Sequence, residues 1–251
     1  MASQKFDFAG ANGHRLSGRI EGPESPRAWA IFAHCFTCGK DSLAATRTTR
    51  ALGAHGVGVL RFDFAGLGAS EGRFGDSTFA ANVADLVAAG QAMTASGKEP
   101  SLLIGHSLGG AASLIAAGAM PSVKAVATIG APYDLKHVLR LFDPVGLSKI
   151  ESDGEAEVRL GGRPFFVRKE LVDGLRESEL RAHIAAMNRP LLVMHSPSDD
   201  TVLIENATHI FAAAKHPKSF VALDGANHLL TQQSDADYVA ELITAWSSRY
   251  L

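Results

Sequence analysis

Short apolar runs alternate with amphipathic stretches of helical periodicity along almost the whole chain, and this alternation restricts the fold more than any other feature. Runs such as Leu102–Gly105 and Leu191–Met194 are apolar at nearly every position, as expected for strands that are buried on both faces. Helices that join such strands cover both faces of a mostly parallel sheet. The sequence therefore predicts an α/β fold.

The apolar runs and the periodic stretches place the expected elements along the chain. The predicted strands are Lys5–Phe8, Arg15–Glu21, Ala28–His34, Gly56–Phe62, Leu102–Gly105, Val123–Ile129, Pro190–His195 and Ser219–Leu223. The predicted helices are Ser42–Ala54, Thr78–Ala95, Leu108–Ala119, Leu203–Ala214 and Asp235–Arg249. In the second helix, Phe79, Val83 and Leu86 share one face at helical spacing, so this face should pack on the sheet.

One segment, from about residue 132 to residue 189, interrupts the alternation. It contains a helix-like DLKHVLRLF, then two short strands around Gly161 and Gly162, then another helix. Because it lies between two sheet strands, we expect a small cap inserted over the strand ends. The 251 residues are therefore expected to form a single domain, 1–251, with this cap insertion at about 132–189.

Charge and hydropathy exclude several classes of partner. The formal net charge is -2, and the lysines and arginines are scattered, which disfavours binding to nucleic acid or to an anionic membrane. No segment approaches the roughly 20 apolar residues that a membrane span requires. The N-terminus has no run typical of a signal peptide. We expect a cytoplasmic protein that acts on a small molecule, with an oligomeric state that the sequence leaves open.

The sequence Gly105-His106-Ser107-Leu108-Gly109 matches the G-x-S-x-G nucleophile elbow, with an apolar strand before it and a helix of small residues after it. The glycines suit a sharp strand-to-helix turn, in which neighbouring backbones leave no room for side chains. Such a turn presents its serine at the carboxyl edge of the sheet, where open α/β sheets bind ligands. Ser107 is therefore the candidate nucleophile.

A serine hydroxyl needs an imidazole to remove its proton, and an acid to orient that imidazole. Both partners follow the serine in chains with this elbow. His228 lies in a loop between the last predicted strand and the last helix, where it can reach back to the elbow. The candidate acids are Asp199 and Asp200, in the turn after Pro190–His195, and the residues alone do not choose between them. The other aspartate would cap the following helix.

Acyl transfer also needs backbone N–H groups that hold the developing oxyanion. One is expected from Leu108, the residue after the nucleophile, and the other from Phe36, in the loop after Ala28–His34. Cys35 and Cys38 form a C-x-x-C in the same loop. This spacing occurs in redox pairs, but two small residues that fill a tight loop are the preferred interpretation.

A glycine-rich stretch and the two aspartates that flank it are weaker indications of function. The glycine-rich stretch 66–72 resembles a dinucleotide fingerprint, but its third glycine is one residue late. The aspartates on either side of it, Asp63 and Asp76, are interpreted as turn and cap residues. Neither a cofactor nor a metal ion is predicted, because the sequence contains no ligand cluster such as H-E-x-x-H.

Over its whole length the chain resembles the α/β-hydrolase superfamily, through HCFTCGKD, FDFAGLGASEG, GHSLGG, HSPSDDTV and GANHLL. The resemblance implies a mostly parallel, eight-stranded sheet with flanking helices, the acid at Asp199 rather than Asp200, and oxyanion donors at Phe36 and Leu108. More narrowly, the HCFTC loop is similar to the hydrolase half of bacterial fusions with an osmotically-inducible-protein-C domain. The resemblance implies such a domain, absent from this chain, as a possible fused or associated partner. Ser196 and Cys35 replace glycines that relatives carry.

The leading hypothesis is a serine carboxylic-ester hydrolase with Ser107, His228 and Asp199 as its triad, acting on small acyl or aryl esters. Phe165 and Phe166 in the cap are candidate lining residues of an apolar pocket. The same triad serves thioesterases, lactonases and peptidases, which remain alternatives. A different class of function, a redox-responsive or scaffolding module that uses Cys35 and Cys38, is the second hypothesis.

Overall fold

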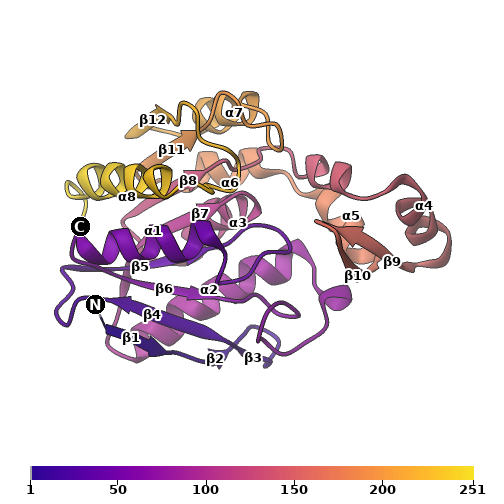
Figure 1. The fold of residues 1–251 in the computed structure, drawn as a ribbon, viewed down its shortest axis with the longest axis horizontal. Helices are drawn as coiled ribbons and strands as arrows, with labels where there is room; N and C mark the ends of the chain where they lie inside the picture. Colours follow the sequence, from indigo (N-terminus) through magenta and orange to yellow (C-terminus); the bar gives the residue numbers. More distant parts are fainter. Residues whose placement is uncertain (1) are drawn as a thin grey trace.

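The computed structural model describes residues 2–251 and contains an eight-stranded sheet in the order β1-β4-β6-β5-β7-β8-β11-β12 (Figure 1). Its strands are β1 (Ala2–Lys5), β4 (Gly18–Gly22), β5 (Ala28–Ala33), β6 (Val57–Phe62), β7 (Pro100–His106), β8 (Ala125–Ile129), β11 (Leu191–His195) and β12 (Lys218–Ala222). The pairs from β6 to β12 are parallel, whereas β4 pairs antiparallel with both β6 and β1. The predicted mostly parallel, eight-stranded sheet is thereby confirmed.

Helices cover both faces of this sheet, and each face has its own core. The helices are α1 (Leu43–Ala54), α2 (Phe79–Ala95), α3 (Leu108–Ala116), α4 (Pro144–Asp153), α5 (Lys169–Glu177), α6 (Leu180–Ala186), α7 (Glu205–Ala213) and α8 (Gln233–Ser247). Successive residues of β5 point to opposite cores: Phe32 packs in the core beneath α1 and α8, and Ile31 in the core beneath α2, α3 and α7. This alternation follows from the period of two of a strand.

The N-terminal strands differ from the prediction. The predicted strand Arg15–Glu21 is divided into β3 (Arg15–Leu16) and β4, and β3 pairs with β2 (Phe8–Ala9) in a separate two-stranded sheet. The break coincides with a close backbone approach at Gly18, where a Cβ atom would lie 2.4 Å from the carbonyl oxygen of Phe6. Only glycine fits at this close approach between the two segments.

Residues 132–189 form the segment that the sequence suggested as a cap. It contains the 3₁₀ helix η3 (Leu135–Leu141), α4, the hairpin of β9 (Glu155–Leu160) and β10 (Arg163–Arg168), α5 and α6. In Figure 1, α4, β9 and β10 extend from one end of the sheet. The segment contacts loops that follow the parallel strands: Phe142 packs near Phe36 after β5, and Phe165 near Phe74 after β6. The segment therefore lies at the carboxyl end of the strands.

Two shorter 3₁₀ helices complete the described elements, η1 (Phe74–Asp76) and η2 (Ala117–Ala119). Throughout residues 2–251, no helix is both long enough and apolar enough to cross a membrane.

Candidate active site

Ser107 lies in a strained turn between β7 and α3. Its backbone has φ 54° and ψ −124°, a conformation that residues other than glycine rarely adopt. The turn is possible because the neighbouring glycines have no side chains: a Cβ atom on Gly109 would lie 2.3 Å from the carbonyl oxygen of Ala33. The sequence pattern G-x-S-x-G therefore corresponds to an actual close approach between α3 and β5.

A chain of hydrogen bonds connects Ser107, His228 and Asp199. The hydroxyl of Ser107 lies 3.0 Å from Nε2 of His228, and Nδ1 of His228 lies 2.7 Å from Oδ2 of Asp199. These residues come from the elbow, from the loop after β12 and from the turn after β11, which the parallel sheet brings to one edge. Each of the three is less than 10% exposed. The geometry matches what proton transfer from a serine to a histidine requires.

The two candidate aspartates have different positions. Oδ1 of Asp199 accepts backbone N–H groups from Thr201 and Val202, at 2.9 and 2.8 Å, which fixes the carboxylate while Oδ2 faces His228. Asp200 is exposed, and within residues 2–251 its side chain hydrogen bonds only to the hydroxyl of Thr201. It does not cap α7, because that helix begins at Glu205, after Ile204. Only Asp199 is placed beside the imidazole.

The environment of Asp199 favours its ionised form. Burial by itself would raise the pKa of this carboxyl, but the hydrogen bond from His228 and the two backbone N–H groups more than offset it, so the pKa lies below its ordinary value. An ionised carboxylate can accept the Nδ1 proton and stabilise an imidazolium.

Two further histidines, His106 and His195, support this arrangement by contacts with the backbone. Nε2 of His106 lies 2.7 Å from the backbone carbonyl of His228, and Nε2 of His195 lies 2.7 Å from the backbone carbonyl of Val202. Burial lowers the pKa of His106 to about 3, and burial also lowers the pKa of His195, so both rings are neutral and can donate one proton. His106 occupies the variable position before the serine, where the motif gives no signal for it.

The loop after β5 contains Phe36, the predicted second oxyanion donor. Phe36 lines the same cavity as Ser107, and Leu108 begins α3, so its N–H has no acceptor within the helix. Among the backbone hydrogen bonds of the described loops, neither N–H group is a donor. The structure thus leaves both groups near the serine available for an oxyanion.

The cysteines of this loop differ from the preferred interpretation of two buried thiols, because Cys35 and Cys38 form a disulfide. The N–H of Cys38 donates to the carbonyl of Cys35 at 3.1 Å, and this turn brings their Cα atoms to 5.3 Å, within the range that a disulfide spans. Thr37, between them, has a positive φ of 57°. The disulfide thus closes a tight loop around Phe36.

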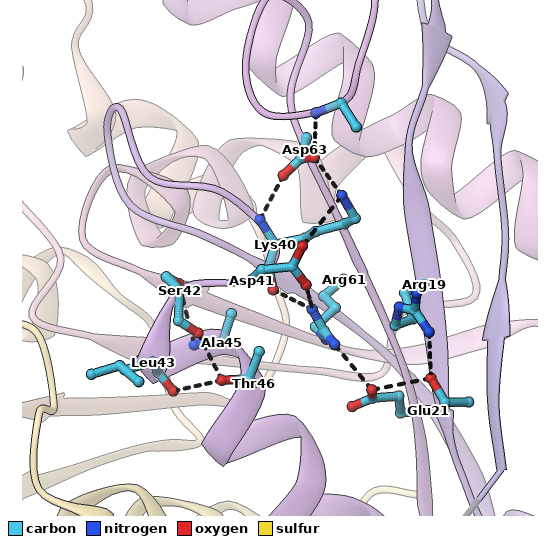
Figure 2. Close-up of polar contacts among 12 residues, drawn as sticks. Arg19, Glu21, Lys40, Asp41, Ser42, Leu43, Ala45, Thr46, Arg61 and Asp63 are labelled. Atoms are coloured by element: carbon cyan, nitrogen blue, oxygen red, sulfur yellow. Dashed lines mark hydrogen bonds and ion pairs between the residues drawn. The ribbon is translucent and has the colours of Figure 1, made fainter. Parts of the chain in front are cut away.

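Buried ion pairs anchor the far end of the same loop (Figure 2). Both the backbone N–H and the ammonium of Lys40 lie 2.6 Å from the carboxylate of Asp63, which also accepts the N–H of Ala69. Arg61 donates to the carbonyl of Lys40 and to the carboxylate of Asp41, and it pairs with Glu21 at 3.0 Å. The interpretation of Asp63 as a turn residue therefore covers only part of its role, because it also fixes the loop that presents Phe36.

Ser107 and His228 lie in a cavity of about 340 Å³ whose remaining lining comes from the disulfide loop, η3, the β9–β10 hairpin and two neighbouring loops. A larger hollow of about 560 Å³ is lined by Tyr133 and His209, among others, but by neither Ser107 nor His228. Phe165 and Phe166 do not line the serine cavity: Phe165 packs against Phe74, and Phe166 is exposed. Within residues 2–251, no His, Cys, Asp and Glu side chains are grouped so that they could hold a metal ion.

Comparison with known proteins agrees with this fold. Residues 25–242 match the model of the alpha/beta hydrolase family. The esterase domain of a Rhodothermus marinus protein is 47% identical, with a TM-score of 0.81 and a match that covers 100% of this chain and 99% of that one. Est1E from Butyrivibrio proteoclasticus, solved with ferulic acid, is 20% identical, with a TM-score of 0.83 and coverage of 97% and 98%, a likeness that shows the fold alone. No curated protein matches the sequence.

The family match extends over most of the chain and includes the serine turn, the Asp199 turn and the His228 loop. The relative with 47% identity is aligned with the whole chain. The protein therefore belongs to the alpha/beta hydrolase family, and one of its solved neighbours is an esterase domain.

Proposed function

We propose that this protein is a serine carboxylic-ester hydrolase that acts on small acyl or aryl esters. The observation that carries the proposal is the chain of hydrogen bonds from Ser107 through His228 to Asp199, with separations of 3.0 and 2.7 Å, in which Ser107 and His228 line a cavity. The 47% identity to an esterase domain supports the choice of an ester over other acyl compounds.

In the proposed mechanism, Oγ of Ser107 attacks the ester carbonyl carbon while Nε2 of His228 takes its proton. The N–H groups of Phe36 and Leu108 donate to the oxyanion, and the C–O bond breaks as His228 returns the proton to the leaving alcohol. Water then attacks the acyl-enzyme in the same way, and the acid is released. Asp199 stays ionised and holds His228 in the tautomer that this cycle needs.

The size and lining of the cavity support small substrates. At about 340 Å³ it lies near the lower end of ligand pockets, which begin at about 300 Å³. Leu141, Leu160 and Leu229 supply apolar surface next to Ser107. A short acyl chain or one aromatic ring fits these dimensions.

The test is hydrolysis of p-nitrophenyl esters from acetate through octanoate. Wild-type protein should hydrolyse the short esters, and Ser107→Ala should lower kcat/KM by about 10⁴-fold or more. Ser101→Ala, near the other end of β7, is the matched control and should behave like the wild type. Absence of activity on every ester, or activity that Ser107→Ala leaves unchanged, would contradict the proposal.

Thioester, lactone and peptide hydrolysis are alternatives within the same chemistry. A panel of matched thioesters, lactones and peptide amides, assayed with the same two variants, ranks them by kcat/KM. The ester proposal predicts that oxygen esters rank highest. A thioester or lactone that is preferred over its matched ester would transfer the assignment to that class.

The second candidate is a redox-responsive module, and the disulfide between Cys35 and Cys38 is the observation that favours it. Both residues line the cavity that contains Ser107, so opening the disulfide would change the loop that holds Phe36. Thiol titration after mild reduction, with activity measured in parallel, tests this candidate. Reversible opening that changes activity supports it, whereas unchanged activity after complete reduction contradicts it.

The associated osmotically-inducible-protein-C domain and the cytoplasmic location stay predictions. Purification of the tagged protein from its native host, followed by mass spectrometry and cell fractionation, addresses both. Recovery of such a domain with the hydrolase would support the association, and recovery in a secreted fraction would contradict the location.

A further inference from the structure

The cavity that contains Ser107 is electrostatically one-sided. Twelve residues line it, and most of those other than Ser107 and His228 are apolar or small. Arg163 is the one member of this set with a permanent charge, and none of the twelve is an acid. Among the surrounding groups, Asp199 lies behind His228 and is already hydrogen bonded to that ring and to two N–H groups.

Arg163 is held at the cavity by contacts that leave its charge unpaired. It is the first residue of β10, next to the turn of the hairpin, and its guanidinium donates to the carbonyl of Thr37 in the disulfide loop. The same guanidinium lies 5.3 Å from the centre of the Phe165 ring. Neither partner carries a charge, and within residues 2–251 Arg163 forms no ion pair.

Two other arginines of the same segment, Arg168 and Arg176, have carboxylate partners. Arg168, at the end of β10, pairs with Asp76 at 2.6 Å and with Glu155 at 3.2 Å. Arg176 in α5 pairs with Glu151. Their positive charges are neutralised within the protein, whereas that of Arg163 remains directed at the cavity.

A guanidinium has five N–H donors in a planar fork that matches a carboxylate. The contact with Thr37 uses only part of that set, and it keeps the side chain near the serine. Arg163 is exposed, so water screens part of its field. The apolar walls beside it reduce that screening and strengthen its attraction for an anion.

We propose that Arg163 makes this protein selective for esters that carry a second, free carboxylate close to the scissile bond, such as half-esters of dicarboxylic acids or hydroxybenzoates acylated on their hydroxyl group. The proposal rests on the ester hydrolase function above and names the substrate class of that site. Arg163 binds the substrate carboxylate, and the bond that breaks is the ester bond attacked by Ser107.

Two matched substrate pairs test the proposal at neutral pH. For the acyl side, the p-nitrophenyl half-ester of adipic acid is compared with p-nitrophenyl hexanoate. For the alcohol side, para-acetoxybenzoate is compared with its methyl ester. The readout is the preference ratio, kcat/KM for the anionic ester divided by kcat/KM for its neutral partner. This ratio cancels effects on Ser107 chemistry and on folding, which both members of a pair share.

Arg163→Gln should lower the preference ratio for at least one pair by about fivefold or more, the factor for two unit charges about 4 Å apart under bulk-water screening. Arg163→Lys should keep a higher ratio than Arg163→Gln, because it retains the charge. Arg159→Gln is the matched control: Arg159 lies in the same hairpin and does not line the cavity. It should leave the ratio unchanged.

High ionic strength screens the attraction between Arg163 and a substrate carboxylate. It should therefore lower the preference ratio of the wild type and leave the preference ratio of Arg163→Gln nearly constant. Equal ratios in wild type and Arg163→Gln for both pairs would overturn the proposal. So would an equal fall in Arg159→Gln, or a ratio for Arg163→Lys no higher than that for Arg163→Gln. Hydrolysis of the neutral esters with unchanged ratios would reject this selectivity alone. Lack of hydrolysis of all four esters by the wild type would reject the ester hydrolase function itself.

Discussion

Nε2 of His106 lies 2.7 Å from the backbone carbonyl oxygen of His228. His106, which precedes Ser107 in the chain, therefore holds the histidine whose ring contacts the hydroxyl of Ser107. The two histidines are 122 positions apart in sequence. This bond fixes the loop after β12 against the end of β7. It requires a proton on Nε2, and burial keeps the ring otherwise neutral. The proposed base is therefore positioned by the elbow itself.

His106→Gln should make the stability of the protein less sensitive to acid. Burial lowers the pKa of His106 to about 3 in the folded state, so below pH 6.5 the unfolded state binds a proton that the folded state does not. Stability therefore falls as the pH drops through this window, by about 1.4 kcal/mol per pH unit. The glutamine side chain of the variant keeps an N–H donor and does not titrate.

Urea unfolding at pH 7 and pH 5 measures the effect of His106→Gln. The loss of unfolding free energy between these pH values should be about 2 kcal/mol smaller in the variant than in the wild type. His55→Gln, at an exposed histidine after α1, controls for the loss of an imidazole. Equal losses in the wild type and in His106→Gln would show that His106 does not supply this sensitivity.

Asp199→Asn should lower kcat on short esters by about 10³- to 10⁴-fold, with little change in KM. An amide can donate to Nδ1 of His228 and so stabilises the tautomer that cannot take the proton of Ser107. Asp200→Asn is the control, because its side chain is exposed and does not contact His228. Steady-state kinetics of both variants test this prediction. An equal fall in kcat in Asp199→Asn and Asp200→Asn would mean that Asp199 has no special role.

Asp63→Ala should destabilise the protein by about 3–5 kcal/mol, because it removes the buried partner of the Lys40 ammonium and leaves only the exposed carboxylate of Asp41, at 3.6 Å. Asp41→Ala also removes a partner of Lys40, but the side chain of Asp41 is 69% exposed, so we expect a loss below about 1 kcal/mol. Urea unfolding compares the two variants. Similar losses would argue against a special contribution of the buried pair.

Gly109→Ala should lower stability by about 3 kcal/mol or more, because the new Cβ would lie 2.3 Å from the carbonyl oxygen of Ala33, a backbone atom that cannot move aside. Gly174→Ala in α5 is the matched control. There a Cβ meets nothing within 4 Å, and alanine should stabilise the helix by about 0.5–1 kcal/mol. Thermal unfolding should show opposite shifts, and a neutral Gly109→Ala would contradict the close approach.

Much of the fold was predictable because its signals are local. Strands buried on both faces are apolar at nearly every position, and helices repeat their apolar residues at helical spacing, so both patterns can be recognised within about ten residues. The separation of β3 from β4 was missed. The break coincides with a tertiary contact, that of Gly18 with Phe6, which residues 15–21 do not reveal by themselves.

The candidate site was only partly predictable. Ser107 was recognisable from its turn and His228 from its place before the last helix, but the residues alone did not separate Asp199 from Asp200, which are neighbours in one turn. The proposed lining by Phe165 and Phe166 was wrong, because the hairpin directs Phe165 toward Phe74. Which side of a hairpin faces a cavity depends on the surface that it packs against.

The sequence by itself determined the alternation of strands and helices from Ala28 onward in the main sheet, the elbow at Ser107 and the loop of His228, because each is encoded by residues close together in the chain. Tertiary structure alone decided that Asp199 faces His228, that His106 holds its backbone, that Asp63 anchors the loop of Phe36, and that Arg163 lines the cavity. These contacts join residues from about 20 to more than 120 positions apart. They form only when the parallel sheet brings its strand ends to one edge.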